Sequence, residues 1–197
     1  VTAVGSATER GSIRATAGNS AAALGLALYT LAHTTITISE GPTTFALVGH
    51  ASRNGTIEAK SQEHVASAMS IVVFCTSSIS VNVAAGASVS MLGLASAGGA
   101  IQASCIGYNL AGALGIAIQS GASSSAVMTI ADGAAITSHG IATDNGSIHA
   151  TARSTAVAVG IVLHIGTSSA VSIVDGANVT LLGWASQSGA ITVSARN

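Results

Sequence analysis

The chain has 197 residues and a formal net charge of −1, with 7% charged, 3% aromatic and 49% hydrophobic residues. So small a net charge gives no electrostatic basis for binding nucleic acid, and the apolar fraction is too high for a disordered chain. The longest apolar runs, Ala21–Leu28 and Ala156–Leu163, are much shorter than the roughly 20 residues of a membrane-spanning helix. Neither a nucleic-acid partner nor a transmembrane segment is therefore expected.

A small residue, any residue and a second small residue recur from one end of the chain to the other. The sites are Gly5/Ala7, Gly25/Ala27, Gly49/Ala51, Gly93/Ala95, Gly115/Ala117, Gly140/Ala142 and Gly183/Ala185, with variants at Ser70/Val72 and Gly160/Val162. Successive sites lie 20 to 25 residues apart. A near-constant step of this size is typical of stacked structural repeats.

Between these sites lie nine short segments that read apolar, polar, apolar. They begin at Ile13, Ile36, Ile57, Val81, Ile101, Met128, Ile148, Val171 and Ile191. A period of two residues indicates a β-strand with one buried face, so the central residue of each triplet is expected to face solvent. Ala-rich stretches such as Ser20–Leu28 also have helix propensity, but the β-branched alternation and the regular glycines favour strands.

These patterns predict an all-β, single-domain parallel β-solenoid over residues 1–197, with about nine coils of about 22 residues each. Right-handed winding is expected from the usual crossover preference. Alternate coils match each other best, so the sequence repeat is a two-coil unit of 43–47 residues. We interpret the chain as a segment of a longer repeat protein or as a subunit that assembles end to end.

The Gly-x-Ala sites are flanked by large apolar residues such as Leu92 and Leu94, or Leu182 and Trp184. Either the small residues or the large ones point outward, and the sequence leaves both orientations open. In both cases one side of the solenoid lacks a polar outer row, which is typical of a contact surface, although a loop of the chain could also cover it. The candidate assembly face consists of Gly5, Ala7, Gly25, Ala27, Gly49, Ala51, Gly93, Ala95, Gly115, Ala117, Gly140, Ala142, Gly183 and Ala185.

Catalytic chemistry is not indicated by the polar residues. The acidic residues Glu40, Asp132 and Asp175 precede glycine, as is common in turns. The six histidines are scattered without the spacing of metal ligands, and Cys75 and Cys105 lie in different columns, so either buried thiols or a bridge is open. We predict no catalytic residue, no cofactor and no metal site.

Three Asn-x-Ser/Thr sequons are candidate glycosylation sites, at Asn54, Asn145 and Asn178. The first two occupy the same position in the repeat, just before a predicted strand. An acceptor in such a turn is expected to be exposed.

The phrases Met91–Ile101 (MLGLASAGGAI) and Leu181–Val193 (LLGWASQSGAITV) resemble the Ser/Ala/Gly-rich repeats of large surface adhesins and of trypanosomatid dispersed-gene-family surface proteins. In coil length the chain is similar to pectin-lyase-like parallel β-helix proteins. The resemblance implies an extracellular or cell-surface solenoid, but carries over no catalytic residue. We expect a non-enzymatic structural or adhesive protein that forms a rod or filament through its coil ends or its Gly/Ala-rich face. The partner is a second copy or neighbouring repeats of a longer chain. The alternatives are a carbohydrate-binding or carbohydrate-active β-helix that takes glycans and, third, an ice-binding solenoid.

Overall fold

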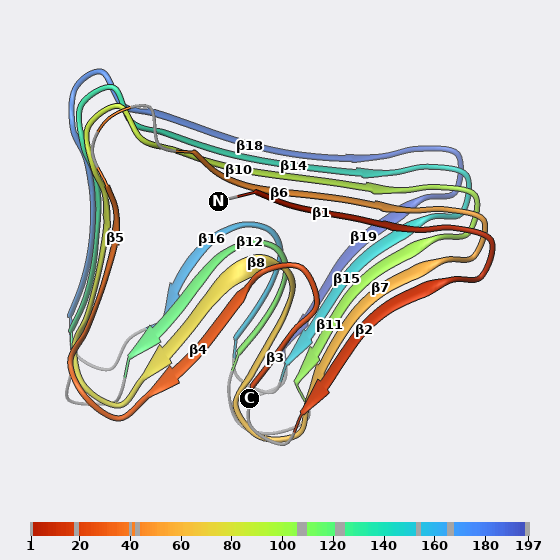
Figure 1. Cartoon of the computed structure of the whole chain (residues 1–197), viewed down its shortest axis with the longest axis horizontal. Helices are drawn as coiled ribbons and strands as arrows, with labels where there is room; N and C mark the ends of the chain where they lie inside the picture. Colours follow the sequence, from red (N-terminus) through yellow and green to blue (C-terminus); the bar gives the residue numbers. More distant parts are fainter. Residues whose placement is uncertain are drawn as a thin grey trace.

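The computed structural model describes residues 2–17, 20–39, 41, 44–105, 110–120, 125–152, 155–164 and 168–195, and the regular elements in these ranges are all β-strands. The strands pass in a fixed cycle through four sheets, which we call A, B, C and D, and one passage through all four is a coil (Figure 1). The pairings between described strands are parallel in every sheet. The predicted all-β parallel solenoid is therefore confirmed.

Sheets A and B each contain five strands. Sheet A contains β1 (Thr2–Ala7), β6 (Thr44–Ala51), β10 (Ser88–Ala95), β14 (Ala135–Ala142) and β18 (Asn178–Ala185). Sheet B contains β2 (Ser12–Ala17), β7 (Thr56–Ser61), β11 (Ala100–Cys105), β15 (Ser147–Ala152) and β19 (Ala190–Ala195).

Sheets C and D are crossed four times in the described chain. Sheet C contains β3 (Ser20–Ala22), β4 (Leu26–Thr30), β8 (Val65–Cys75), β12 (Leu110–Ser120) and β16 (Thr155–His164), with β3 and β4 both pairing with β8. Sheet D contains β5 (Thr34–Ile38), β9 (Ile79–Val83), β13 (Ser125–Ile130) and β17 (Ser168–Ile173). Residues Ser20–Leu28 thus contain β3 and the beginning of β4, and they do not form a helix.

The stacking distance along the sequence differs from the predicted coil of about 22 residues. The glycines paired along sheet A are residues 5, 49, 93, 140 and 183, so the steps are 44, 44, 47 and 43 residues. The sites at 25, 70, 115 and 160 lie between these in sequence but occupy sheet C. The nine expected coils are therefore about four and a half, because each coil carries the small-residue motif twice, once in sheet A and once in sheet C.

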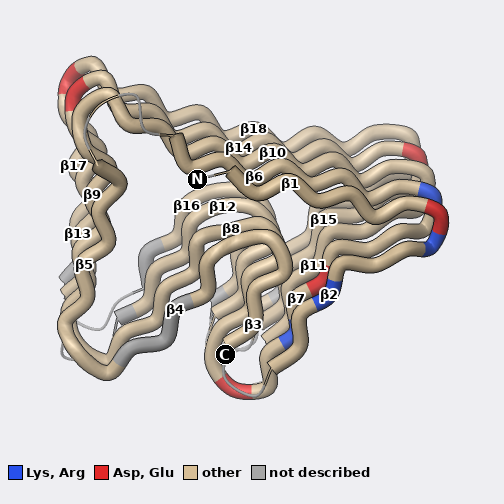
Figure 2. Tube along the Cα trace, viewed as in Figure 1, with Lys and Arg blue, Asp and Glu red and all other residues tan. Residues whose placement is uncertain are grey.

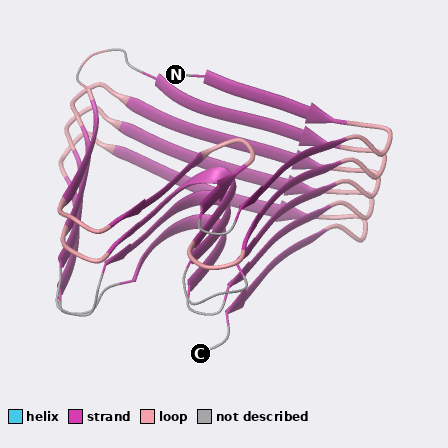
Figure 3. Cartoon of the chain, turned by 60° about the horizontal axis from the view of Figure 1, so that its bottom comes forward, coloured by secondary structure: helices cyan, strands magenta, loops and turns pink. Residues whose placement is uncertain are grey.

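The molecule is consequently short along its coil axis. Five strands at the usual spacing of about 4.8 Å span only about 19 Å, and the view down the shortest axis superimposes the coils (Figure 1). In that view the chain runs clockwise from β1 through β2, β4 and β5. The turned view (Figure 3) brings the bottom of the molecule forward and shows the N-terminal strand at the top of the stack, so β1 is the strand of sheet A nearest the viewer in Figure 1. Clockwise winding away from the viewer is right-handed, as expected.

Inward side chains form columns of like residues, which build the core. In sheet B the column is Ile13, Ile57, Ile101, Ile148 and Ile191. The three middle isoleucines have no exposed surface, whereas the two outer ones are half-buried. Burying a side chain of this size stabilises the fold by about 1.5–3 kcal/mol, so the middle coils contribute most of the hydrophobic free energy.

In the described part of the chain no helix is long and apolar enough to cross a membrane.

The corner between sheets A and B is a stack of five tight turns with the pattern Ser/Thr-x-x-Gly. In each turn the glycine N–H donates to the Ser or Thr carbonyl at 2.7–2.8 Å, as from Gly99 to Ser96. The two central residues have positive φ, for example Arg53 and Asn54 at 49° and 61°, which is the geometry of a type I′ turn. A Cβ on Gly99 would collide with the Ala51 carbonyl oxygen of the coil before. Glycine is thus required here by close stacking.

Sheet C bends inward as an arch whose two legs face each other, unlike the flatter sheets A and D (Figure 1). The bend lies at Gly115 and Gly160, whose φ values are +146° and +140°. Residues of β8 are buried on both faces: Met69 and Ile71 pack into the main core, whereas Val65 and Val72 belong to a second cluster between the legs. Leu110, Ala117 and Val157 of the next coils complete that cluster.

At the apex of the arch Ser70 replaces the glycine of the other coils. Its hydroxyl donates to the Gly112 carbonyl at 2.8 Å, and the Ser67 hydroxyl donates to the Ser70 carbonyl at 2.6 Å. At the mouth of the arch, the His64 and Phe74 rings stack with 6.2 Å between centroids. Each polar group at the apex thus has a partner while the legs stay packed together.

Candidate functional site

The small residues of the predicted assembly face point into the molecule in sheet A. Gly5, Gly49, Gly93 and Gly140 are buried, and a Cβ on Gly93 would meet Leu114 and Ile101. Their alanine partners are likewise buried, at Ala7, Ala51, Ala95 and Ala142. Only the last pair, Gly183 and Ala185 in β18, is exposed. The question left open by the sequence is therefore settled for sheet A: the large residues face outward.

The motifs of sheet C are also enclosed. Gly115 and Ala117 are buried in β12, Ala117 in the cluster between the legs. Gly25 is half-buried beneath the Ser70 backbone, and Ala27 packs against the same cluster. These residues allow the arch to close tightly, so they form packing contacts and not an open surface.

The outer face of sheet A carries two apolar columns, which we call the ridge. One column is Val4, Val48, Leu92, His139 and Leu182, and the other is Ser6, His50, Leu94, Ile141 and Trp184. Exposure is high for Val4 (70%), Trp184 (59%) and Leu182 (44%). None of the residues in the five strands of sheet A is charged, and Figure 2 shows charges at the corners and on sheet B instead. The other half of the outer face carries mainly Ser and Thr side chains such as Ser90 and Thr137, so the ridge is an uncharged, largely apolar strip. Such a strip is typical of an interaction surface.

The outer face of sheet B is polar and brings three charged residues together. The carboxylate of Glu58 accepts from Arg14 Nε and from Lys60 Nζ, each at 2.7 Å. The Glu58 side chain is only 7% exposed, so its expected solvent exposure was wrong, because the Arg14 and Lys60 side chains cover it. In the same column follow Gln102, His149 and Thr192, with His149 hydrogen-bonded to Thr192 and Thr151.

The central residues of the nine predicted triplets are divided between two sheets. Arg14, Glu58, Gln102, His149 and Thr192 lie on sheet B, whereas Thr37, Asn82, Thr129 and Ser172 lie on sheet D. Arg14 and Glu58 therefore lie side by side on sheet B although they are 44 residues apart in the sequence. Pairing between residues 44 apart would have been visible only with the correct coil length.

All three sequon asparagines are exposed. Asn54 and Asn145 are equivalent residues of the A–B corner turns, with φ of 61° and 62°. The Asn54 side-chain oxygen lies over Gly98 of the next turn. Asn178 starts β18 and accepts a hydrogen bond from the Thr180 hydroxyl at 3.2 Å. The three asparagines are thus accessible, and their glycosylation stays a prediction.

Among the residues that the structure describes, no group of three or more His, Cys, Asp or Glu side chains could hold a metal ion. His50 and His139 lie in sheet A on strands separated by β10, His149 lies in sheet B, and His33 lies between β4 and β5. Asp132 and Asp175 sit in exposed D–A turns, and Glu40 lies outside the described residues. Cys75 and Cys105 are buried thiols in sheets C and B and do not form a disulfide.

The last coil exposes side chains that are buried in every inner coil. Ile173 is 56% exposed although its neighbour Ile130 is fully buried, and Val193 is 55% exposed above the buried Ala150. In the described sheets β18 and β19 each pair on one side only.

No family model, curated protein or solved structure matches this chain. The assignment of the fold therefore rests on strand register and burial alone. Those observations support a parallel β-solenoid and leave its finer relationship to be proposed.

Proposed function

We propose that the chain is a non-enzymatic structural or adhesive repeat module that associates through its coil ends. The observation that carries this proposal is the constant parallel register of sheets A and B, to which a further coil of a second copy or of neighbouring repeats can add beside β18 and β19. Neither strand contains a charged residue or proline, which are common means of blocking an edge. An edge of this kind favours addition of another parallel strand.

The first coil supplies a matching surface. If β1 and β2 of a second copy continue sheets A and B, Gly183 meets Gly5, Ala185 meets Ala7 and Ile191 meets Ile13, so the columns of the core continue in register. The chain crosses sheets A and B five times and sheets C and D four times. Sheets C and D of the two copies would stay one strand apart, and the contact is confined to sheets A and B.

An extracellular or cell-surface location, and the resemblance to adhesins and to pectin-lyase-like β-helices, belong to this same proposal. Its support is the Ser/Ala/Gly-rich phrase of β10 and β18, the exposed sequon positions Asn54 and Asn145, and the very low content of charge. A surface module of this type would work by presenting a rigid face and not by turning over a substrate.

The test is electron microscopy and sedimentation velocity over a range of concentrations. Wild-type protein should form chains of end-to-end copies that lengthen with concentration. Val193→Lys and Leu181→Lys place a charge in the inner columns of the last coil, so these variants should shorten the assemblies. The matched control is Val127→Lys, which changes an outward residue of β13 with 37% exposure. Dispersed wild-type monomers at high concentration, or unaffected assembly of both end variants, would refute the proposal.

A second candidate function is glycan binding on the outer face of sheet B. The observation that favours it is the polar column with Glu58, Gln102 and His149, which offers hydrogen-bonding groups about every 4.8 Å along the axis. A single carboxylate next to Arg14 and Lys60 lacks the second acid used in most glycoside hydrolysis, so binding is proposed and not cleavage. Binding of wild-type protein on a polysaccharide array, lost in Gln102→Ala, would support it. Failure to bind any polysaccharide would exclude it.

A further inference from the structure

We infer that the ridge on sheet A is a second, independent interface, and that its occupant is the ridge of another copy of this chain. Two copies would pack face to face, related by a two-fold axis that runs parallel to the strands at the level of β10. This contact is closed and lateral, so it differs from the open end-to-end contact proposed above and does not depend on it.

The size of the face is adequate for a specific dimer. The contact would use the whole outer face of sheet A, of which the ridge is the half beside the A–B corner. Four strands of eight residues and β1 of six, about 4.8 Å apart and at about 3.3 Å per residue, give a projected face of roughly 600 Å² per copy. Two such faces bury roughly 1,200 Å², the lower limit of the range for specific protein interfaces. Because no strand residue of sheet A is charged, pairing two such faces removes no charge from water.

The side chains of one ridge column increase in size along the stack. From β1 to β18 the column is Ser6, His50, Leu94, Ile141 and Trp184. The proposed axis reverses the order of the strands without reversing their direction, so Trp184 faces Ser6 of the partner and Leu94 faces its own copy. The largest residue of the column thereby meets the smallest, and His50 meets Ile141. An axis along the stack would instead place Trp184 of both copies at the same end and wedge the faces apart.

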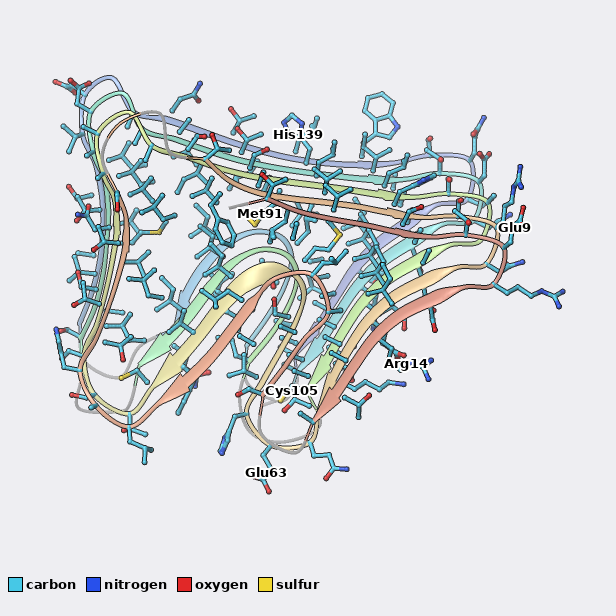
Figure 4. All side chains as sticks on the ribbon, in the orientation of Figure 1. Glu9, Arg14, Glu63, Met91, Cys105 and His139 are labelled. Atoms are coloured by element: carbon cyan, nitrogen blue, oxygen red, sulfur yellow. The ribbon has the colours of Figure 1, made fainter. Side chains whose placement is uncertain are left out.

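The corner turns beside the ridge are complementary under the same axis. Their first central residues, in stacking order, are Glu9, Arg53, Ala97, Asp144 and Gln187. Reversal brings Arg53 opposite Asp144 of the partner twice, and it brings the neutral Ala97 opposite itself. Arg53 has a 71% exposed side chain that currently pairs with Glu9 at 2.7 Å, and Figure 4 places Glu9 at this outer edge. Opposite charges at a rim orient partners more than they add affinity.

The far end of sheet A lacks this complementarity. The D–A turns there carry the exposed Asp132 and Asp175, and the two-fold brings no basic residue opposite them in the described chain. The dimer is therefore expected to be tightest beside the A–B corner. His139, which Figure 4 shows pointing outward from the ridge, lies in the strand that faces β6 of the partner.

The experiment is sedimentation equilibrium of the full chain, with variants at the axis and at the rim. Leu92→Glu places two carboxylates opposite each other and should weaken the dimer by at least about a hundredfold. Val127→Glu on sheet D is the matched control, because Val127 has nearly the same exposure, 37% against 39% for Leu92. It should dimerise as the wild type does.

A charge-swap cycle tests the orientation. Arg53→Asp alone and Asp144→Arg alone should each weaken the dimer roughly threefold to tenfold, and the double variant should recover it. Both positions have φ near 49° and already accept either residue type, so the fold should tolerate the exchange. Monomeric wild type at millimolar concentration, an unaffected Leu92→Glu dimer, or a double variant without recovery would overturn the inference.

The two contacts fail in different ways. If Val193→Lys abolishes long assemblies while a discrete dimer remains and is lost in Leu92→Glu, both proposals hold. If Val193→Lys abolishes all association, the lateral contact is overturned and the end contact stands. If Leu92→Glu abolishes the only association detected, the lateral contact stands and the end contact is refuted.

Discussion

The A–B corner and the sheet C arch both change the direction of the chain within a coil, but they do so by different means. The corner repeats one four-residue turn five times, with a glycine fixed by the backbone of the coil before. The arch varies between coils: it has a break between β3 and β4, serines in β8, and a glycine with positive φ in both β12 and β16. Local geometry thus determines the corner, whereas side-chain packing across the two legs determines the arch. Substitutions should therefore act through backbone clashes at the corner and through cavities or lost hydrogen bonds in the arch.

The largest effect is expected at a corner glycine. Gly99→Val would drive a Cβ and two methyl groups into the Ala51 carbonyl, so we expect a loss of more than about 3 kcal/mol in the free energy of unfolding. Urea unfolding followed by circular dichroism measures it. The control is Gly183→Val in the exposed β18, whose Cβ would meet only Ile191 at ordinary distance; equal losses at both sites would contradict the role of stacking.

The second core should be next in magnitude. Leu110 is fully buried in the cluster between the legs of the arch, so Leu110→Ala should cost about 3 kcal/mol through lost burial and the cavity it leaves. The measurement is again the free energy of unfolding. Leu182→Ala, an equal truncation on the exposed ridge, should cost far less in dilute solution. A small effect of Leu110→Ala would mean that the legs are not packed together.

The serine at the apex of the arch should matter through hydrogen bonds. Ser70→Ala removes the donor to the Gly112 carbonyl and a partner of the Ser67 hydroxyl, both in a buried region, so about 2 kcal/mol of stability should be lost. Ser88→Ala, which breaks an exposed hydroxyl contact with Thr44, should cost less. Amide exchange near Gly112 that is unchanged in Ser70→Ala would contradict this account.

The smallest effect is expected to be stabilising. Ala97 occupies the corner turn with φ of 47°, where an alanine is strained relative to glycine. Ala97→Gly should therefore raise the free energy of unfolding by about 1 kcal/mol, a rise of a few degrees in Tm. Ala100→Gly, in the adjacent strand, should lower stability instead. The two neighbouring substitutions thus have opposite predicted signs.

The corner was also the part of the fold that sequence could predict. The regular glycines and the alternating triplets indicate strands and turns directly, and the isoleucine column lies in sheet B. The arch was not predictable in this way. Residues Val65–Cys75 are apolar or small at both parities because both faces are buried, so their periodicity carries no signal for a bend.

The coil length was missed for a related reason. Gly93 and Gly115 carry the same motif, yet one lies in sheet A and the other in sheet C, and the sequence cannot distinguish two positions of one coil from one position in two coils. The better match between alternate segments was the correct signal. Among candidate surfaces, the outward ridge was one of two orientations that the sequence left open, and the Gly and Ala residues chosen as the assembly face point inward in sheet A. The burial of Glu58 required knowing that Arg14 lies beside it.

Differences in coil length never involve the A–B corner. They occur at the connections of sheet C and at the first D–A connection, which has five residues between β5 and β6 against four between β9 and β10. From the last inward residue of sheet A to the first isoleucine of sheet B the distance is always six residues, as from Ala95 to Ile101. The connection from sheet C to sheet D has three residues between β8 and β9, Thr76 to Ser78, but four between β12 and β13. The connection from sheet B to sheet C likewise has three residues between β7 and β8 but four between β11 and β12. Extra sequence grafted into the connections that enter and leave sheet C should thus be displayed in a row along one edge. Such a scaffold could vary what it presents from coil to coil without changing how it winds.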